Sequence, residues 1–234
     1  LLSSMGVKVA KHGNKAVSSK CGSGDVLEAL NIKINLEPND IEAQIDKNNF
    51  GFMFAPNYHS AMRFVGPTRK KIGKRTIFNM IGPLSSPALV KKQVIGVFDK
   101  KLLKIFANAL KSLDIKFAWI VNSDDGLDEI SIFAPTNFYF KRGKNITKKK
   151  ISHTKYKKYL SSKLNFKDIK GGIPSYNASR LIELFQGKKD SYRDITIINS
   201  IYAMQTIKPT IKFDECFDIC LLYTSDAADD NAGV

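Results

Sequence analysis

The sequence has few cysteines and no long apolar run. Its 234 residues include only 3 cysteines, an odd number that forms neither a disulfide framework nor a CxxC motif. The densest apolar run, Phe117 to Val121, is far shorter than the roughly 18 residues that a membrane span needs. With 43% hydrophobic and 25% charged residues, the chain can bury a sizeable core. The composition therefore argues against disorder throughout, a disulfide scaffold and a membrane partner, and it predicts a cytoplasmic protein with reduced thiols.

Acidic residues are missing from one stretch of the chain. Residues 141–158 contain nine Lys or Arg and no Asp or Glu, so this stretch supplies most of the net charge of +15. Single-strand binders interleave several aromatic residues with their basic ones, and Tyr156 is the base-stacking candidate in this run. A solvated lysine-rich surface is the favoured interpretation, and a nucleic-acid footprint is the alternative. No specific nucleic-acid partner is expected.

The two ends of the chain look unnatural. The sequence starts without an initiating Met or a signal peptide and runs directly into the strand-like GVKVA at Gly6 to Ala10. Phe213 to Cys220 has a helical apolar period, but residues 221–234 have no Lys or Arg and no amphipathic period. They resemble translated adapter sequence. We therefore expect a partial domain over residues 1–220 and a non-native tail over residues 221–234.

Strand-like and helix-like segments alternate between the ends. Asp25 and Asn39 each precede a Glu by three residues, the spacing of a helix-capping box. GFMF at residues 51–54, VIGVF at 94–98 and FAWIV at 117–121 are typical of buried strands, and an amphipathic helix is expected between the last two. This alternation predicts an α/β fold, in which ligands gather at the carboxyl ends of strands.

The loop from Lys11 to Asp25 is the first candidate site. It leaves a strand, enters a helix, and combines glycines, serines and lysines that suit a phosphate cradle. It matches neither GxxxxGK[ST] nor GxGxxG. An ordinary glycine- and serine-rich turn fits the composition equally well.

Two further segments carry candidate chemistry. SDDGLDEIS places four carboxylates within six residues, which indicates either a Mg²⁺ site or a solvated acidic turn. Residues 57–87 contain Arg63, Arg69 and Arg75, and a guanidinium can bind a carboxylate with two hydrogen bonds. The sequence does not decide which arginine is used. His12 and His59, taken alone, are interpreted as hydrogen-bonded structural histidines.

Taken together, these blocks are recognisable as a family pattern. VKVAKHGNKAVSSKCGSGDVLEAL, GFMFAPNYHSAMR, RTIFNMIGPLSSP, QVIGVFDK and DGLDEIS stand in the order and at the separations of the anthranilate phosphoribosyltransferases, and the resemblance extends from Gly6 to about Cys220. It implies the large α/β domain of that family, shared with nucleoside phosphorylases, in which helices flank a central, mostly parallel sheet. It also implies that phosphoribosyl pyrophosphate and anthranilate react with Mg²⁺ to give phosphoribosylanthranilate and pyrophosphate in tryptophan biosynthesis.

The resemblance assigns roles position by position, with no covalent nucleophile. Phosphoribosyl pyrophosphate is expected at the KHGN loop, at Lys11, His12, Gly13, Asn14, Lys15, Ala16, Val17, Ser18, Ser19 and Ser23. Anthranilate is expected at Asn14 and Arg69, with His12 and Pro83 lining its path, and Asp128 and Glu129 are the expected metal ligands. The full-length protein is expected to be a homodimer, and the oligomeric state of this fragment stays open.

The chain also departs from the family pattern. Lys15, Cys21 and Ser85-Ser86 replace the usual Arg, Ser and Thr-Asn. The helical domain and the glycine-rich loop that precede the KHGN block in the family are absent from this sequence, so the fragment alone is expected to be inactive. Two alternatives of the same fold stay open, a nucleic-acid-binding relative and a pyrimidine nucleoside phosphorylase.

Overall fold

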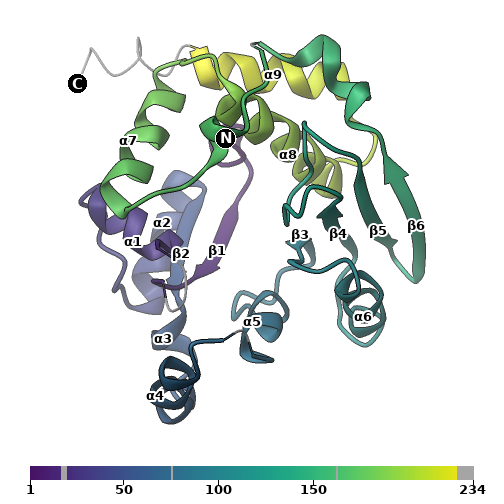
Figure 1. Cartoon of the computed structure of the whole chain (residues 1–234). Coiled ribbons are helices and arrows are strands. Elements are labelled where there is room, and N and C mark those ends of the chain that lie inside the picture. Colours follow the sequence, from purple (N-terminus) through teal and green to yellow (C-terminus); the bar gives the residue numbers. More distant parts are fainter. Residues whose placement is uncertain (17–19, 75, 162, 226–234) are drawn as a thin grey trace. The chain divides into compact units, whose positions relative to one another are not determined.

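The computed structural model describes residues 1–16, 20–74, 76–161 and 163–225, and the chain divides into two compact units. The β1–β2 unit comprises Gly6–Leu89 and Gly171–Glu183, and the β3–β6 unit comprises Leu1–Met5, Val90–Lys170 and Leu184–Val234. Figure 1 labels the elements of both units. Each unit combines strands with helices, which confirms the expected α/β class.

A short parallel sheet organises the β1–β2 unit. β1 (Val9–Gly13) pairs with β2 (Phe50–Phe54), with Gly13 opposite Phe54. β2 coincides with the apolar GFMF run, and its Phe52 and Met53 side chains are buried. β1 begins three residues later than the GVKVA run predicted. The reason is that Gly6 has a φ of 78°, so the extended backbone starts only after it.

Helices follow both strands of this unit. α2 packs closely over β2, because a Cβ added at Gly51 would lie 2.6 Å from Ile45 and 2.8 Å from Ile41. The cap predicted at Asn39 lies inside α2, which starts at Pro38, a residue suited to the first helical position. The helices are α1 (Ser23–Ala29), α2 (Pro38–Asn48), α3 (Ala55–Tyr58), α4 (Met62–Ile72), α5 (Phe78–Ile81), the 3₁₀ turn η1 (Gly82–Leu84) and α7 (Pro174–Phe185), of which the last two residues belong to the other unit.

The β3–β6 unit contains a mixed sheet. β3 (Lys92–Gly96) and β4 (Phe117–Ser123) are parallel, as predicted. β5 (Thr136–Arg142) and β6 (Asn145–Ile151) continue the sheet in antiparallel fashion, which the sequence did not predict. The two-residue turn at Gly143-Lys144 leaves room only for an antiparallel return, and Gly143 supplies the φ of 59° that such a turn needs.

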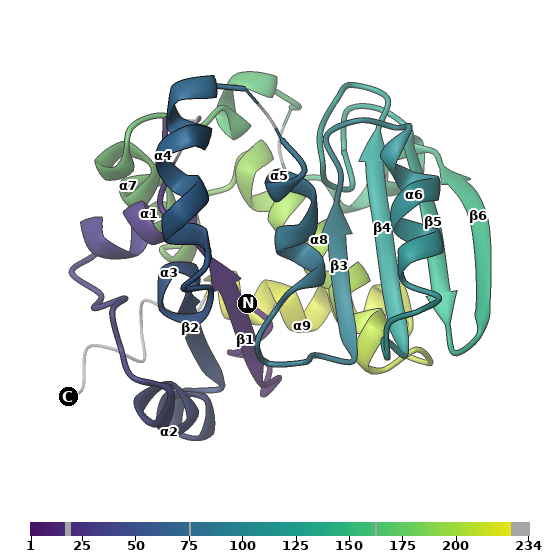
Figure 2. The same ribbon diagram turned by 90° about the horizontal axis from the view of Figure 1, so that it is seen from below.

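Helices cover both faces of the mixed sheet. α6 (Leu102–Ala109) and α8 (Ser191–Ile207) lie on opposite faces of it (Figures 1 and 2). This double cover explains why VIGVF and FAWIV are continuous apolar runs, since Ile95, Val97 and Ile120 are all at most 2% exposed. The unit also contains η2 (His153–Tyr159), η3 (Phe166–Ile169) and α9 (Phe213–Ser225).

α9 continues five residues beyond Cys220, where the sequence predicted that the native helix is cut. Residues 226–234 lie outside the described part of the chain, and the boundary at residue 220 stays a prediction. None of the helices that the structure describes combines the length and the apolar character needed to cross a membrane.

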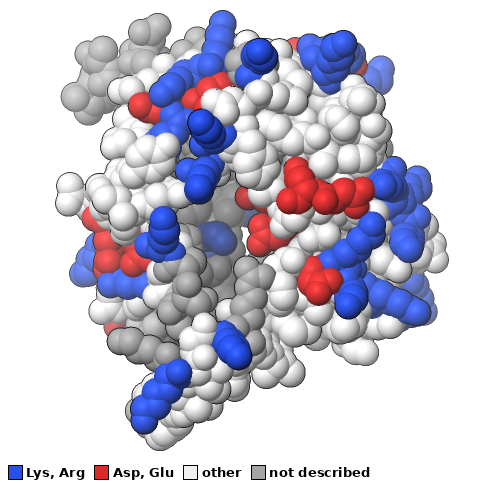
Figure 3. Space-filling model, viewed as in Figure 1, with Lys and Arg blue, Asp and Glu red and all other residues white. Residues whose placement is uncertain are grey.

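The lysine-rich stretch 141–158 is built into the sheet. It forms the end of β5, the exposed outer strand β6 and most of η2, and Figure 3 shows Lys and Arg side chains gathered along this side of the sheet. Lys150 and Lys158 form ion pairs with Asp124 and Asp214. Lysines on an outer strand discourage edge-to-edge pairing with other chains, which gives this charge a structural role.

Tyr156 is a core residue. Its side chain is 0% exposed, and its hydroxyl lies 2.9 Å from the Tyr202 hydroxyl of α8. Phe213 of α9 stacks on it with a centroid distance of 6.0 Å, and burial raises the pKa of both phenols. Tyr156 is therefore occupied in joining η2, α8 and α9, and it is not available to stack on a nucleic-acid base.

The buried tyrosine pair gives a stability prediction. Tyr156→Phe should lower the free energy of unfolding by about 1–3 kcal/mol, because it leaves the Tyr202 hydroxyl buried without its partner. The double substitution Tyr156→Phe and Tyr202→Phe should cost less than the sum of the two single changes. Urea unfolding followed by circular dichroism measures both, with Tyr176→Phe, at a side chain that is 45% exposed, as the control. Strictly additive losses would contradict a buried hydroxyl pair.

Candidate functional site

The KHGN block begins at the carboxyl end of β1. Lys11, His12 and Gly13 are the last residues of that strand, and the chain then turns towards α1. A Cβ added at Gly13 would lie 2.5 Å from the Ser23 hydroxyl oxygen and 2.8 Å from the Phe52 ring. A larger residue here would force the Ser23 or Phe52 side chain to move, so Gly13 allows both to pack against the end of the strand.

Asp25 closes the loop between β1 and α1. Its Oδ2 accepts hydrogen bonds from the Ala16 and Gly22 backbone N–H groups at 2.8 and 2.7 Å. The predicted cap position was wrong by three residues: Gly22 is the N-cap, and Asp25 reaches back to it from the third helical position. The capping-box spacing in the sequence indicated that Asp25 lies at a helix start, but it did not predict the hydrogen bond from Ala16.

The structure describes only part of the predicted phosphate loop. Val17, Ser18 and Ser19 lie outside the described residues. In the described part, the Asn14 carbonyl accepts the Gly24 N–H at 3.1 Å, and the Asn14 Oδ1 accepts the Lys15 N–H at 2.7 Å. A Cβ at Gly22 would lie 2.7 Å from the Asn14 carbonyl oxygen. Backbone contacts therefore hold both ends of the loop together.

The two lysines of this loop have different surroundings. Lys15 forms an ion pair with Glu28 of α1 at 2.8 Å. Lys11 has no carboxylate partner among the described residues, although its side chain remains open to solvent. Desolvation by the surrounding protein lowers the pKa of Lys11. An anion beside Lys11 would relieve this cost, so Lys11 is the better candidate of the two for a phosphate contact.

His12 and His59 form a pair. Their Nε2 atoms lie 3.1 Å apart, and the two rings meet edge to face with centroids 5.0 Å apart. Burial and the neighbouring His59 lower the pKa of His12, despite an opposing hydrogen bond to the Gly82 backbone. His12 is thus favoured as a neutral ring. Its hydrogen-bond partner Gly82 directly precedes Pro83 in the sequence. No sequence pattern indicated that His59 contacts His12.

Arg69 lies on α4 and faces α5. Its guanidinium carbon is 5.4 Å from the centroid of the Phe78 ring. No carboxylate of the described residues pairs with it, so its donors are available for an anionic ligand. Arg69 is the one of the three candidate arginines whose side chain the structure describes, and Arg75 lies outside the described residues.

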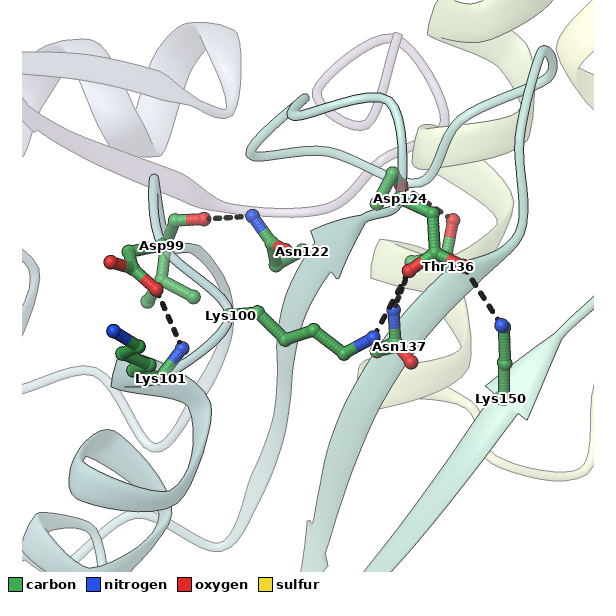
Figure 4. A network of polar contacts seen from close by, with 10 residues as sticks. Asp99, Lys100, Lys101, Asn122, Asp124, Thr136, Asn137 and Lys150 are labelled. Atoms are coloured by element: carbon green, nitrogen blue, oxygen red, sulfur yellow. Dashed lines mark hydrogen bonds and ion pairs between the residues drawn. The ribbon is translucent and has the colours of Figure 1, made fainter.

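Two of the four clustered carboxylates are taken by the protein itself. Asp124 accepts hydrogen bonds from Lys100, Asn137 and Lys150 at 3.2, 2.6 and 2.8 Å (Figure 4). These partners hold the pKa of Asp124 well below its usual range. Asp125 accepts the Ser131 hydroxyl at 2.5 Å and the Leu127 N–H at 3.2 Å. Asp124 and Asp125 are therefore structural residues of the loop after β4.

Asp128 and Glu129 have no such partners. Within the described residues, no hydrogen bond or ion pair engages either side-chain carboxylate. Glu129 keeps contact with solvent, yet desolvation and then the charge of Asp128 raise the pKa of its carboxyl. Both residues lie in the loop after β4, as binding of one shared ion requires. The loop packs closely against Gly96 of β3, where an added Cβ would lie 1.8 Å from the Asp128 carbonyl oxygen.

Asp128 and Glu129 suit Mg²⁺ better than they suit a metal ion whose ligands all come from the protein. No cluster of three or more His, Cys, Asp or Glu suited to a metal occurs in the part of the chain that the structure describes. Mg²⁺ does not need such a cluster, because it usually takes one or two carboxylates and completes its shell with waters and substrate phosphates. Two adjacent, unpartnered oxygen ligands meet that description.

The predicted residues thus fall into groups within each unit. In the β1–β2 unit, contacts connect His12 with Gly82, next to Pro83, and connect the ends of the phosphate loop through Asp25. Arg69 belongs to the same unit, on α4. Asp128 and Glu129 belong to the β3–β6 unit.

Comparison with known proteins gives consistent matches. Residues 1–217 match the family model described as "Glycosyl transferase family, a/b domain". The chain is 67% identical over 201 residues to an anthranilate phosphoribosyltransferase of Pelagibacter ubique, and 45% identical over 205 residues to one of Clostridium kluyveri. These matches cover 86% and 87% of this chain and 60% of each relative, so the chain spans about 60% of their length.

Solved structures share the fold. The anthranilate phosphoribosyltransferase of Thermus thermophilus superposes with a TM-score of 0.83 at 30% identity, covering 96% of this chain and 66% of that one. The Saccharomyces cerevisiae enzyme, in complex with PRPP and Mg, gives a TM-score of 0.82 at 24% identity, covering 95% and 62%. With the family match over nearly the whole chain, these findings lead to one conclusion: the chain belongs to the glycosyl transferase family and carries its a/b domain.

Proposed function

We propose that the protein containing this chain transfers the phosphoribosyl group of phosphoribosyl pyrophosphate to the amino group of anthranilate. The observation that carries the proposal is that Asp128, Glu129 and Arg69 have no ion-pair partner among the described residues, while the neighbouring Asp124 is fully engaged. Charged groups left open in this way suit a ligand better than a structural role. The identity of 67% with the Pelagibacter ubique enzyme of that name supports the same reaction.

The β1–β2 unit carries the residues that we assign to the organic substrates. The KHGN loop holds phosphate oxygens of phosphoribosyl pyrophosphate, and Lys11, which has no carboxylate partner among the described residues, supplies the cation. Arg69 binds the anthranilate carboxylate with two hydrogen bonds, and Asn14 holds the acceptor beside the ribose. His12, favoured as a neutral ring by its lowered pKa, lines the path of the uncharged amine together with Pro83.

The proposed reaction needs placement more than acid–base chemistry. The bond between ribose C1 and the pyrophosphate oxygen breaks, and its electron pair leaves with pyrophosphate. The amine nitrogen forms the new bond to C1 and releases a proton. A Mg²⁺ ion held by Asp128 and Glu129 would neutralise charge on the departing pyrophosphate. A cation such as Lys11 stabilises charge on a phosphate, and Arg69 orients the amine by binding the anthranilate carboxylate, so no protein nucleophile is required.

The setting of the protein is also a proposal. We infer a cytoplasmic location, supported by Cys21, Cys216 and Cys220, none of which is in a disulfide in the described part of the chain. A homodimer of the whole protein is proposed from the family resemblance alone. No specific observation favours the alternatives: Tyr156 is buried, which removes the base-stacking candidate of a nucleic-acid site, and no feature of the described residues favours a phosphorylase.

The whole protein, with the segment that its longer relatives have, should form phosphoribosylanthranilate only when Mg²⁺ is present. Loss of anthranilate fluorescence on addition of phosphoribosyl pyrophosphate measures the reaction, and a chelator should abolish it. A folded whole protein that leaves anthranilate unchanged under these conditions would overturn the proposal.

Substitutions should separate the acceptor contact from the metal contact. Arg69→Ala should raise the KM for anthranilate by about 10- to 100-fold, since a hydrogen bond to a charged group contributes about 1.5–3 kcal/mol, and should change the KM for phosphoribosyl pyrophosphate much less. Arg69→Lys should fall in between, because lysine keeps the charge and loses the planar pair of donors. Lys71→Ala, on the same helix, is the control.

Asp128→Asn and Glu129→Gln should instead raise the Mg²⁺ concentration needed for half-maximal activity, because each removes one anionic ligand with little change of shape. Asp40→Asn, at an exposed position on α2, controls for the loss of one negative charge. Steady-state kinetics with each substrate and with Mg²⁺ varied in turn provides the comparison. Equal effects of the Arg69 and carboxylate variants on all three constants would show that the roles are wrongly assigned.

A further inference from the structure

The loop that carries Asp128 and Glu129 is tied to α8 by one side chain. Asn199 accepts the Ile130 backbone N–H on its Oδ1 at 2.9 Å, and its Nδ2 donates to the Ile130 carbonyl oxygen at 2.9 Å. Both backbone groups of Ile130 are thus satisfied by a single amide. Asn199 is 69 residues away in the sequence, so no local pattern could have indicated this contact.

The Asn199 amide is itself held in place. Its Nδ2 also donates to the Ile195 carbonyl oxygen of its own helix at 2.9 Å. The Ile130 side chain is 1% exposed, and Asn199 is half-buried. Because α8 orients the Asn199 amide, its donor and its acceptor have fixed positions relative to the loop. A water molecule could form the same hydrogen bonds to Ile130, but it would not hold the peptide in one orientation.

Two further contacts fix the same loop from other sides. The Ser123 hydroxyl donates to the Glu129 carbonyl oxygen at 2.6 Å. On β3, Gly96 leaves room for the Asp128 carbonyl oxygen, which would lie 1.8 Å from an added Cβ. The backbone on both sides of the two carboxylates is therefore held, while the carboxylates themselves have no partner among the described residues.

We propose that Asn199 is a positioning residue for the metal-binding carboxylates. The inference rests on the proposed function, in which Asp128 and Glu129 hold Mg²⁺. Ile130 follows Glu129 directly, so a shift of its peptide moves the Glu129 Cα and its carboxylate. Metal sites need ligands held within about 0.5 Å of the productive geometry, and groups that orient ligands typically contribute 10- to 100-fold to metal affinity.

The first measurement concerns the loop alone and needs neither metal nor turnover. Hydrogen exchange of the Ile130 amide should become about tenfold faster or more in Asn199→Ala, because that amide loses its acceptor. Ser200→Ala is the matched control, since the Ser200 hydroxyl bonds to the Thr196 carbonyl within α8. Unchanged exchange at Ile130 in a folded Asn199→Ala variant would overturn the contact on which the inference depends.

The second measurement is Mn²⁺ binding to the whole protein in the presence of phosphoribosyl pyrophosphate, followed by electron paramagnetic resonance. Mn²⁺ shares the preference of Mg²⁺ for carboxylate and water ligands. Asn199→Ala should weaken binding by about 10- to 100-fold, while the KM for anthranilate changes little and Ser200→Ala matches the parent. A purely structural role would instead lower stability and leave metal affinity unchanged.

Asn199→Asp keeps the proposal testable if the alanine variant fails to fold. Aspartate retains an acceptor for the Ile130 N–H and loses the donor to the Ile130 carbonyl, so the amide should stay protected while Mn²⁺ affinity falls. If the parent binds Mn²⁺ and both variants bind it equally well, the positioning role is wrong and the proposed function stands. If the parent itself binds no Mn²⁺, the metal pair and the proposed function fail together with the inference.

Discussion

The close approach of Gly96 on β3 to the Asp128 backbone is the constraint on which the candidate metal site depends. A Cβ at this position would lie 1.8 Å from the Asp128 carbonyl oxygen, a distance that no structure tolerates without moving the loop. The hydroxyl of Ser123 and the amide of Asn199 then hold the next two peptides. Contacts from β3, β4 and α8 thus position the backbone of Asp128 and Glu129. Their carboxylates do not have to form contacts to hold this position.

In both units, some charged side chains have hydrogen-bond or ion-pair partners and others of the same type do not. Asp124, Asp125 and Asp25 stabilise loops by accepting hydrogen bonds from lysine, serine and backbone donors. Asp128 and Glu129 are left open. Lys15 is likewise paired with Glu28, whereas Lys11 has no carboxylate partner in the described part of the chain. Asp128, Glu129 and Lys11 are thus the groups in these loops whose charge a substrate or an ion could stabilise.

Much of this arrangement could be predicted from the sequence, and the failures have physical causes. The strands β2 and β4 and the helix α6 follow from apolar patterns that local side chains dictate. The antiparallel hairpin β5–β6 was missed because its second strand is exposed and rich in lysine, so it has no apolar alternation to reveal it. The contacts of Asn199 with Ile130 and of His59 with His12 were missed because they join distant residues, and a sequence pattern carries no information on such pairs.

We propose above that the two open carboxylates after β4 hold the metal on which the reaction depends. A crystal structure of the whole protein with phosphoribosyl pyrophosphate and Mn²⁺ would test this proposal, because the anomalous signal of manganese locates the ion. We expect manganese within about 2–2.5 Å of oxygens of Asp128 or Glu129, with both Asn199 to Ile130 hydrogen bonds intact. Manganese bound only by other residues, with Asp128 and Glu129 pointing into solvent, would contradict it.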